Sequence, residues 1–299
     1  MEAQFTIYSS CPVCGSTAIQ KKLVATDYLV SGKEFEIWQC EQCTLRFTQN
    51  IPDEDSIGQY YKSDNYVSHT ETNKGIINRL YHLVRTLTLA DKRRLIMSIT
   101  QLESGKILDL GAGTGAFLQH MQSHGWQTIG LEPDEEARKK AKELHNVNLL
   151  PPDAFMRFQP ESVDVVTMWH VLEHVHHLHE YIEQLKKVIK PRGIICIAVP
   201  NYECYDASVY KNFWAAYDVP RHLYHFSEEA MFQLVEKHGL RIHAIRPMWY
   251  DSFYISLLSE KNKKNKSNLI KAFLVGCISN MKAFIDKEKS SSLIYVIGK

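Results

Sequence analysis

The sequence predicts an α/β fold preceded by a small cysteine-rich domain, and three observations support this prediction. The run from Ile107 to Gly115 reads as an apolar strand that ends at Asp109, and a loop with three glycines then leads into a helical pattern from Phe117. Two C-x-x-C pairs precede this unit. The 299 residues, 44% of them hydrophobic, suffice to bury one large core plus an accessory domain.

The cysteine pairs predict a metal site in a domain of residues 1–66. They flank a predicted hairpin with strands at Lys21–Leu29 and Glu34–Gln39 and a turn at Ser31-Gly32. A redox role is less favoured, because two pairs occur and neither lies between a strand and a helix. Zinc prefers four soft ligands in a tetrahedron, and metal binding would supply most of the folding free energy of so small a segment. We therefore predict structural Zn²⁺ held by Cys11, Cys14, Cys40 and Cys43.

Residues 67–104 are predicted to form a helical connector. Apolar residues recur at helical spacing over Ile76–Ile99, and we expect this helix to pack on the edge of the sheet.

The glycine loop that follows fits two cofactors. Gly111, Gly113 and Ala116 meet the dinucleotide pattern, with the acidic Glu132 roughly 20 residues on, so a nicotinamide oxidoreductase stays open. The alternative is S-adenosylmethionine.

From this loop onward the chain resembles the class I S-adenosylmethionine-dependent methyltransferases, over about residues 105 to 250. Thr128–Glu132 is similar to the second strand of that family, Ser162–Trp169 to the fourth, Ile194–Val199 to the fifth and Leu240–Arg246 to the sixth. The resemblance implies a Rossmann-like, mostly parallel sheet of seven strands in a domain of residues 105–299. The last strand, Leu293–Ile297, would be antiparallel and enter between the fifth and sixth.

The resemblance also implies cofactor contacts. Glu132 would hold both ribose hydroxyls, Asp153 the exocyclic amine of adenine, and the backbone N–H of Ala154 the ring nitrogen. The acid before the first glycine of the loop corresponds to Asp109, and Trp169 and His170 would contact the cofactor side. The loop itself would contribute Gly111, Gly113 and Gly115.

A second segment, Tyr217–Ser227, resembles a block of bacterial methyltransferases of cell-surface sugar and lipid pathways. It is dense in residues that could hold an acceptor, and Arg221 could bind an anionic group with two hydrogen bonds. His222 or His225 could take the acceptor proton near neutral pH, although His225 also precedes Ser227, a predicted N-cap for a helix over Glu229–His238. The other predicted substrate contacts are Tyr217, Asp218, His174 and, by analogy with relatives in which the region before the fold covers the cofactor, Tyr66.

The stretch from Trp38 to Phe47, with Tyr60, Tyr61 and Tyr66, also resembles the zinc-bearing part of deoxysugar C-methyltransferases, in which the small domain helps to cover the active site. This resemblance implies that the ribbon is a lid. Zinc ribbons also bind nucleic acid, so a ribbon-guided RNA methyltransferase is a rival function. Acidic residues outnumber the basic doublet Lys21-Lys22 near the knuckles, and the formal net charge of +1 gives no basis for general nucleic-acid binding.

A helical insertion is predicted at about residues 261–290. Lys261–Lys266 is expected to be a solvated loop, and a helix at about 268–286 carries an apolar stripe. We expect the stripe to pack on the domain or on a second copy of the chain, as in a homodimer. The alternative is peripheral contact with a membrane surface beside the basic loop.

The sequence thus predicts an enzyme that moves the methyl group of S-adenosylmethionine to a small-molecule, sugar or lipid-linked acceptor. A nicotinamide oxidoreductase and a noncatalytic cofactor-binding module are the remaining alternatives. We find no run of about 18 apolar residues and no basic-then-apolar leader, so a cytoplasmic location is expected.

Overall fold

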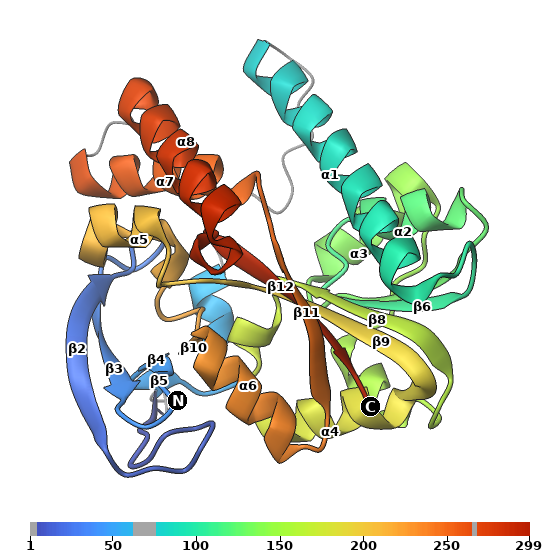
Figure 1. Cartoon of the computed structure of the whole chain (residues 1–299), viewed down its shortest axis with the longest axis horizontal. Helices are drawn as coiled ribbons and strands as arrows, with labels where there is room; N and C mark the ends of the chain where they lie inside the picture. The colour runs from blue at the N-terminus through green and yellow to red at the C-terminus, as the bar shows by residue number, and fades with distance from the viewer. Residues whose placement is uncertain (1–4, 62–75, 265–267) are drawn as a thin grey trace. The chain divides into compact units, whose positions relative to one another are not determined.

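The computed structural model describes residues 5–61, 76–264 and 268–299 (Figure 1). The chain is divided into two compact units. The first comprises Met1–Tyr66, His170–Ile182 and Ile197–Val296, and the second comprises Val67–Trp169, Glu183–Cys196 and Ile297–Lys299. Each unit therefore contains segments that are far apart in the sequence. The predicted domain boundaries at 66/67 and 104/105 stay predictions.

The N-terminal part of the first unit contains the predicted hairpin. Strand β2 (Ile19–Thr26) pairs antiparallel with β3 (Glu34–Cys40), and β3 pairs with β4 (Arg46–Thr48). The order of this four-stranded sheet is β10-β4-β3-β2, because a distant strand, β10 (Tyr224–His225), pairs antiparallel with β4. The short strands β1 (Phe5–Thr6) and β5 (Ile51–Pro52) pair separately.

The tip of the hairpin is stabilised by one buried carboxylate. Asp27 accepts hydrogen bonds from the backbone N–H groups of Leu29, Val30 and Ser31, which are the donors that a tight turn leaves without partners. The rest of this unit is mainly helical, around a core that includes Trp214, Tyr210 and Ile37. Its helices and remaining strand are η1 (Ile57–Tyr61), η3 (Leu172–His174), α5 (Tyr205–Tyr210), η4 (Lys211–Phe213), η5 (Ala215–Tyr217), α6 (Glu228–Lys237), β11 (Arg241–Pro247), α7 (Asp251–Lys264), α8 (Leu269–Ile285) and η6 (Lys287–Lys289).

The second unit contains the strand, glycine loop and helix that the sequence predicted. Strand β6 (Lys106–Leu110) pairs in parallel with β7 (Gln127–Leu131) and with β8 (Val163–Trp169). Apolar residues from these strands and from helices α1 (Ile76–Thr100) and α2 (Ala116–Gln122), among them Ile96, Ile107 and Phe117, form its core. The helices are α1 (Ile76–Thr100), α2 (Ala116–Gln122), α3 (Glu135–His145) and η2 (Pro152–Arg157), and α4 (Leu178–Val188) contributes its C-terminal half.

Two strands, β9 (Ile189–Pro200) and β12 (Ser292–Gly298), have residues in both units. The main sheet has the order β11-β12-β9-β8-β6-β7, which confirms the predicted entry of the last strand beside β9 and β11. The fold is the expected Rossmann-like, mostly parallel one. In the part of the chain that the structure describes, however, this sheet has six strands, so the prediction of seven is wrong.

The position where a further strand could pair with β7 is occupied by a single β-bridge. Leu150 pairs in parallel with Leu131, and its backbone N–H donates to the Gly130 carbonyl oxygen at 2.9 Å. Pro151 and Pro152 follow at once. A proline has no N–H for the ladder, and helix η2 begins at Pro152. The proline pair therefore ends the strand after one bridge.

The C-terminal insertion differs from its prediction in two ways. Residues 261–264 continue helix α7 and are not loop, while the remainder of the predicted loop, 265–267, lies outside the described residues. Helix α8 forms where it was expected and lies beside α7 (Figure 1). Its apolar stripe does not pack on the domain. The large side chains are exposed, and the small residues Ala272, Gly276, Ser279 and Ala283 are buried instead.

Candidate functional site

The glycine loop of the second unit has the backbone that the sequence predicted. Gly111, Gly113 and Gly115 all have positive φ, at 69°, 55° and 78°, which favours glycine. The third glycine is also needed for packing, because a Cβ there would lie 3.1 Å from the Ala141 Cβ. A Cβ on Gly113 would meet nothing within 4 Å. The backbone at Gly113 is therefore open to a ligand.

Two buried carboxylates flank this loop. Glu132, at the end of β7, accepts hydrogen bonds from the backbone N–H groups of Gly113 at 2.8 Å and Asp134 at 3.0 Å, one on each oxygen. A carboxylate offers about four lone pairs and can accept from several donors at once, ribose hydroxyls among them. Asp109 accepts a 2.6 Å hydrogen bond from the Thr167 hydroxyl, and burial raises the pKa of Asp109 to about 7.

Trp169 ends β8 in the same unit and lies against two side chains. Its ring meets Phe117 edge to face, with centroids 5.7 Å apart, and the Lys92 ammonium lies 4.1 Å from the Trp169 ring centroid. The Trp169 Nε1 is buried and has no hydrogen-bond partner among the described residues. An orphaned buried donor is costly unless something binds it, so a ligand that accepts from this indole would fit. No motif in the sequence marks Lys92, which lies on a helix predicted only as a connector.

The predicted adenine contacts lie on η2 of this unit. The Asp153 side chain is largely exposed and forms an ion pair with Arg157 at 2.6 Å. The Ala154 backbone N–H donates to the Pro151 carbonyl oxygen at 3.1 Å. Both groups are therefore engaged locally, and their contact with adenine stays a prediction.

The first unit gathers a different set of predicted residues, around a buried glutamate. His170 has a left-handed φ of 58°. Its Nε2 donates to Asp251 Oδ2 at 2.9 Å, and its Nδ1 lies 3.3 Å from Glu173 Oε1. Burial alone would lower the pKa of His170, but the two carboxylates outweigh this effect and raise it to about 10. The ring is therefore a partly exposed cation that links two anions. Neither carboxylate was assigned a role from the sequence, although Glu173 lies between two predicted histidines.

Two further histidines meet the same glutamate. The rings of His174 and His222 are edge to face with centroids 4.6 Å apart, and His222 Nε2 lies 4.0 Å from Glu173 Oε1 and 3.9 Å from Asp218 Oδ2. The His222 Nδ1 lies 2.9 Å from the Ala216 carbonyl oxygen. Because a carbonyl only accepts, Nδ1 carries the proton and Nε2 of the neutral ring holds the free lone pair. This atom is well placed to accept a proton.

His174 is held more tightly. Its Nδ1 lies 2.9 Å from both the Tyr61 hydroxyl and the Arg221 carbonyl oxygen. Burial, together with the neighbouring His222, lowers the pKa of His174 to about 4. The ring therefore stays neutral in the folded protein at neutral pH. The donor atoms of Glu173, His174 and His222 lie within 4.8 Å of one another, a combination that could also bind a divalent cation.

His225 and Tyr217 are core residues. His225 Nε2 lies 3.2 Å from Thr48 Oγ1, and burial, with His222 and Arg46 nearby, lowers the pKa of His225 well below its ordinary value. Tyr217 is 3% exposed, and its hydroxyl accepts from Arg46 at 2.9 Å. The structure therefore favours His222 over His225 as the proton acceptor. It also identifies Ser227 as the N-cap of α6, as predicted.

Arg221 is saturated by protein groups. Its guanidinium donates to Asp218 Oδ1 at 2.7 Å, to Asp27 Oδ1 at 2.9 Å and to the Tyr60 carbonyl oxygen at 2.8 Å, and the residue is 1% exposed. These contacts favour a structural role for Arg221, and its predicted contact with an anionic substrate stays a prediction. Tyr66 lies outside the described residues.

The four predicted metal ligands converge in the first unit. Cys11 and Cys43 sulfurs lie 3.4 Å apart, and those of Cys14 and Cys40 lie 3.5 Å apart. These distances are too long for disulfide bonds of about 2.05 Å. All four sulfurs lie within 4.8 Å of one another. In the second knuckle the Cys43 backbone N–H donates to the Cys40 sulfur at 3.5 Å. A thiolate donor set of this kind fits tetrahedral Zn²⁺.

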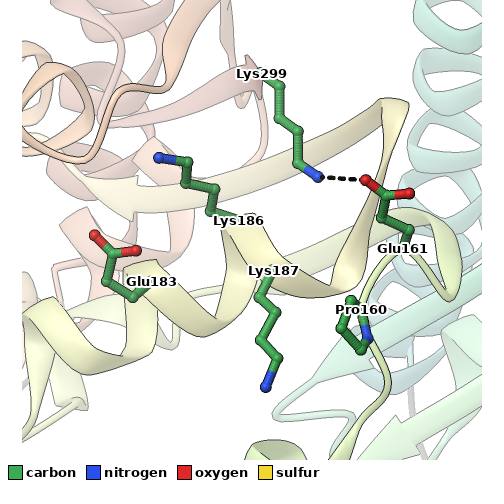
Figure 2. Close-up of a pocket in the computed structure, with 6 residues that line it drawn as sticks. All are labelled: Pro160, Glu161, Glu183, Lys186, Lys187 and Lys299. Carbon is green, nitrogen blue, oxygen red and sulfur yellow. Dashed lines mark ion pairs between the residues drawn. The ribbon is translucent and has the colours of Figure 1, made fainter.

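A hollow of about 390 Å³ lies elsewhere in the second unit (Figure 2). It is lined by Glu161, Glu183 and three lysines, and Lys299 approaches Glu161 at 3.7 Å. None of the predicted site residues lines it, and the side chains that line it do not point to a nucleophile or a base. This hollow is not the candidate site.

Known proteins resemble this chain over its central part. Residues 82–245 match a methyltransferase domain family. The chain is 24% identical over 186 residues to a demethylmenaquinone methyltransferase of Staphylococcus saprophyticus, a match that covers 56% of this chain and 80% of that protein. It is 26% identical over 113 residues to a ubiquinone biosynthesis O-methyltransferase of Leptothrix cholodnii, covering 35% of this chain but only 48%, about half, of that protein. The structure of a SAM-dependent methyltransferase from Archaeoglobus fulgidus superposes with a TM-score of 0.50 at 21% identity, over 72% of this chain and 94% of that one.

Proposed function

We propose that this chain, which belongs to the methyltransferase domain family and is an S-adenosylmethionine-dependent methyltransferase, methylates a small molecule. In this proposal the acceptor atom of that molecule loses a proton to His222. The observation that carries the proposal is the His222 Nε2 lone pair, which lies about equally far from two carboxylates, Glu173 and Asp218. The alternative of a nicotinamide oxidoreductase loses its support, because the glycine loop lies in a domain of the methyltransferase family, for which the cofactor is S-adenosylmethionine.

The second unit supplies the residues that would hold the cofactor. S-adenosylmethionine, when bound, supplies a methyl group already activated on a sulfonium sulfur. Glu132, at the end of β7, would accept the ribose hydroxyls, and the open backbone at Gly113 would allow close approach. The buried Trp169 Nε1 would gain an acceptor. Asp109 would hold the loop through Thr167.

The first unit supplies the residues that would hold the acceptor and its proton. As the acceptor atom is methylated, its proton would pass to the lone pair of His222 Nε2. The charge that develops on the imidazole would be stabilised by the Glu173 and Asp218 carboxylates. Glu173 is fully buried, and although burial alone would raise its pKa, the neighbouring His170, His222 and His174 together outweigh burial and hold that pKa below its usual range. An anion is thereby kept beside the base.

We propose that the acceptor is a small molecule with an ionisable hydroxyl, because relatives are named for demethylmenaquinone and ubiquinone biosynthesis. A sugar or lipid-linked acceptor is the second candidate, since the zinc-ribbon segment resembles that of deoxysugar methyltransferases. A panel of hydroxylated quinone precursors and nucleotide deoxysugars, assayed for S-adenosylhomocysteine release, distinguishes these classes. If only the nucleotide deoxysugars are methylated, the proposal that the acceptor is a small molecule with an ionisable hydroxyl is wrong.

We also propose that Cys11, Cys14, Cys40 and Cys43 bind structural Zn²⁺. The sulfurs converge between two knuckles, and three of the four cysteines are buried. The neighbouring sheet is small, and metal binding would add folding free energy on the order of 10 kcal/mol. The zinc would stabilise β2, β3 and β4 and take no part in methyl transfer.

The function is tested with His222→Asn and a matched control, His177→Asn, which replaces an exposed histidine. We expect His222→Asn to lower kcat by about 10²–10⁴-fold, the usual contribution of a general base, with unchanged calorimetric affinity for S-adenosylhomocysteine. His177→Asn should retain wild-type kcat. Full activity in His222→Asn would exclude it as the base. Failure of the wild-type protein to bind S-adenosylhomocysteine would instead contradict the cofactor assignment.

A further inference from the structure

One face of helix α8 is apolar and open to solvent. Eight large apolar side chains of this helix expose between 39% and 86% of their surface, and the most exposed are Ile270, Phe284 and Ile285. At roughly 150–250 Å² for a large side chain, the exposed apolar surface is on the order of 1,000 Å². Monomeric proteins rarely expose contiguous patches above a few hundred Å², and larger ones usually mark binding surfaces.

The packing of α8 fixes which face is exposed. A Cβ on Gly276 would lie 2.6 Å from the Phe253 Cδ1 of α7, so only glycine allows this approach. The Ser252 hydroxyl donates to the Gly276 carbonyl oxygen at 3.3 Å. Farther along, the Ser279 hydroxyl donates to the buried Asp206 at 2.7 Å. Rotating α8 to bury its large side chains would break all of these contacts, so the apolar face is held outward.

The sequence segment that contains this helix carries most of the excess positive charge of the chain, although Lys271 within it pairs with the buried Glu260. Residues 261–289 contain eight lysines and two acidic residues, Asp286 and Glu288, which gives the segment a formal charge of +6. The whole chain carries +1, so all other residues together carry −5. Lys282 and Lys287 are exposed beside the apolar side chains. An apolar stripe bordered by lysines is the pattern of a helix that lies in the interface of an anionic membrane.

We propose that this face of α8 docks on an anionic phospholipid bilayer, with the helix lying in the plane of the surface. Its 17 residues span about 26 Å, and none of the described helices is long and apolar enough to cross a membrane. A second copy of the chain fits less well. In a two-fold interface the same patch meets itself, so two segments of +6 would be juxtaposed, whereas anionic headgroups neutralise that charge.

The test is co-sedimentation of the full chain with vesicles of phosphatidylcholine alone or with added phosphatidylglycerol. We expect binding only to the vesicles that contain phosphatidylglycerol, and release at high salt because the attraction is partly electrostatic. The double variant Phe284→Ser/Ile285→Ser should bind at least about tenfold more weakly, since two buried apolar side chains are lost. Both side chains are exposed, and circular dichroism checks that the variant is folded.

Leu144→Ser is the matched control, because Leu144 is a half-exposed apolar residue on another helix, α3, and should leave vesicle binding unchanged. Absence of wild-type binding, or equal binding by the double variant, would overturn the proposal. Sedimentation velocity provides a further check. A wild-type dimer that Phe284→Ser/Ile285→Ser converts to a monomer would show that a second copy covers the face. No cofactor or acceptor is needed, so the result is independent of the methyltransferase assays.

Discussion

Replacing Asp251 with asparagine tests the charge on His170. The His170 ring is flanked by Asp251 at 2.9 Å and Glu173 at 3.3 Å. Burial would lower its pKa, but these carboxylates raise it from the ordinary 6.5 to about 10. Asparagine matches aspartate in shape and keeps a side-chain oxygen at the first residue of α7. The substitution therefore removes charge with little other change.

The free energy of unfolding at pH 7 is expected to fall by about 1–3 kcal/mol. A rise in pKa from 6.5 to about 10 corresponds to at most about 5 kcal/mol, at about 1.36 kcal/mol per pKa unit. Two facts reduce this limit. His170 keeps 31% of its side-chain surface exposed, so water screens the pair, and Glu173 remains beside the ring in the variant.

The pH dependence has a defined sign. Because the folded-state pKa is the higher one, the charged ring stabilises the folded protein fully below pH 6.5, and this stabilisation is lost as the pH rises through about 10. Urea unfolding followed by tryptophan fluorescence, from pH 6.5 to above pH 10, measures it in both proteins. The difference between them should shrink toward pH 10. Equal stability at every pH, or a His170 proton resonance that titrates near 6.5, would refute the reasoning.

Three further substitutions test other contacts. Glu132→Ala should weaken S-adenosylhomocysteine binding by about 1–3 kcal/mol, the value of hydrogen bonds to a charged group, and unchanged calorimetric affinity would remove Glu132 from the ribose role. Cys40→Ser should release zinc and unfold the hairpin sheet while the unit with the glycine loop stays folded. Full zinc content by elemental analysis would contradict the four-cysteine site. Gly276→Ala should lower the free energy of unfolding by about 1–3 kcal/mol, because its Cβ would lie 2.6 Å from Phe253. Urea unfolding measures this change, and wild-type stability would show that α7 and α8 are not in close contact.

Features set by short-range backbone requirements could be predicted from the sequence. The glycine loop was predictable because positive φ at Gly111, Gly113 and Gly115 leaves few alternatives to glycine. The hairpin was predictable because β-branched and aromatic residues lie on either side of a Ser-Gly turn. The cysteine cluster followed from two identical spacings. Each of these signals lies within a few residues of the feature that it specifies.

Features set by distant partners could not be predicted. The charge on His170 depends on Asp251, which is 81 residues away, and the engagement of Arg221 depends on Asp27, which is 194 residues away. The apolar stripe on α8 was predicted, but whether it faces the protein or the solvent depends on the close packing of Gly276 against α7. A helical period alone does not reveal this packing. The absence of a seventh strand in the described sheet could not be predicted either, because it depends on the pairing with β7 ending after the single bridge at Leu150.

The four-stranded sheet has a consequence for the order of events during synthesis. Its edge strand β10 (Tyr224–His225) pairs with β4 (Arg46–Thr48), so the N-terminal sheet is incomplete until about 180 more residues have been made. Asp27 likewise lacks its hydrogen-bond donor Arg221 until that residue has been synthesised. A nascent chain therefore carries β4 with an unpaired edge, which is a template for association with other chains. Fragments released from the ribosome before β10 has been synthesised should therefore aggregate. Zinc bound by the four cysteines would not prevent this aggregation, because the edge of β4 would still be unpaired.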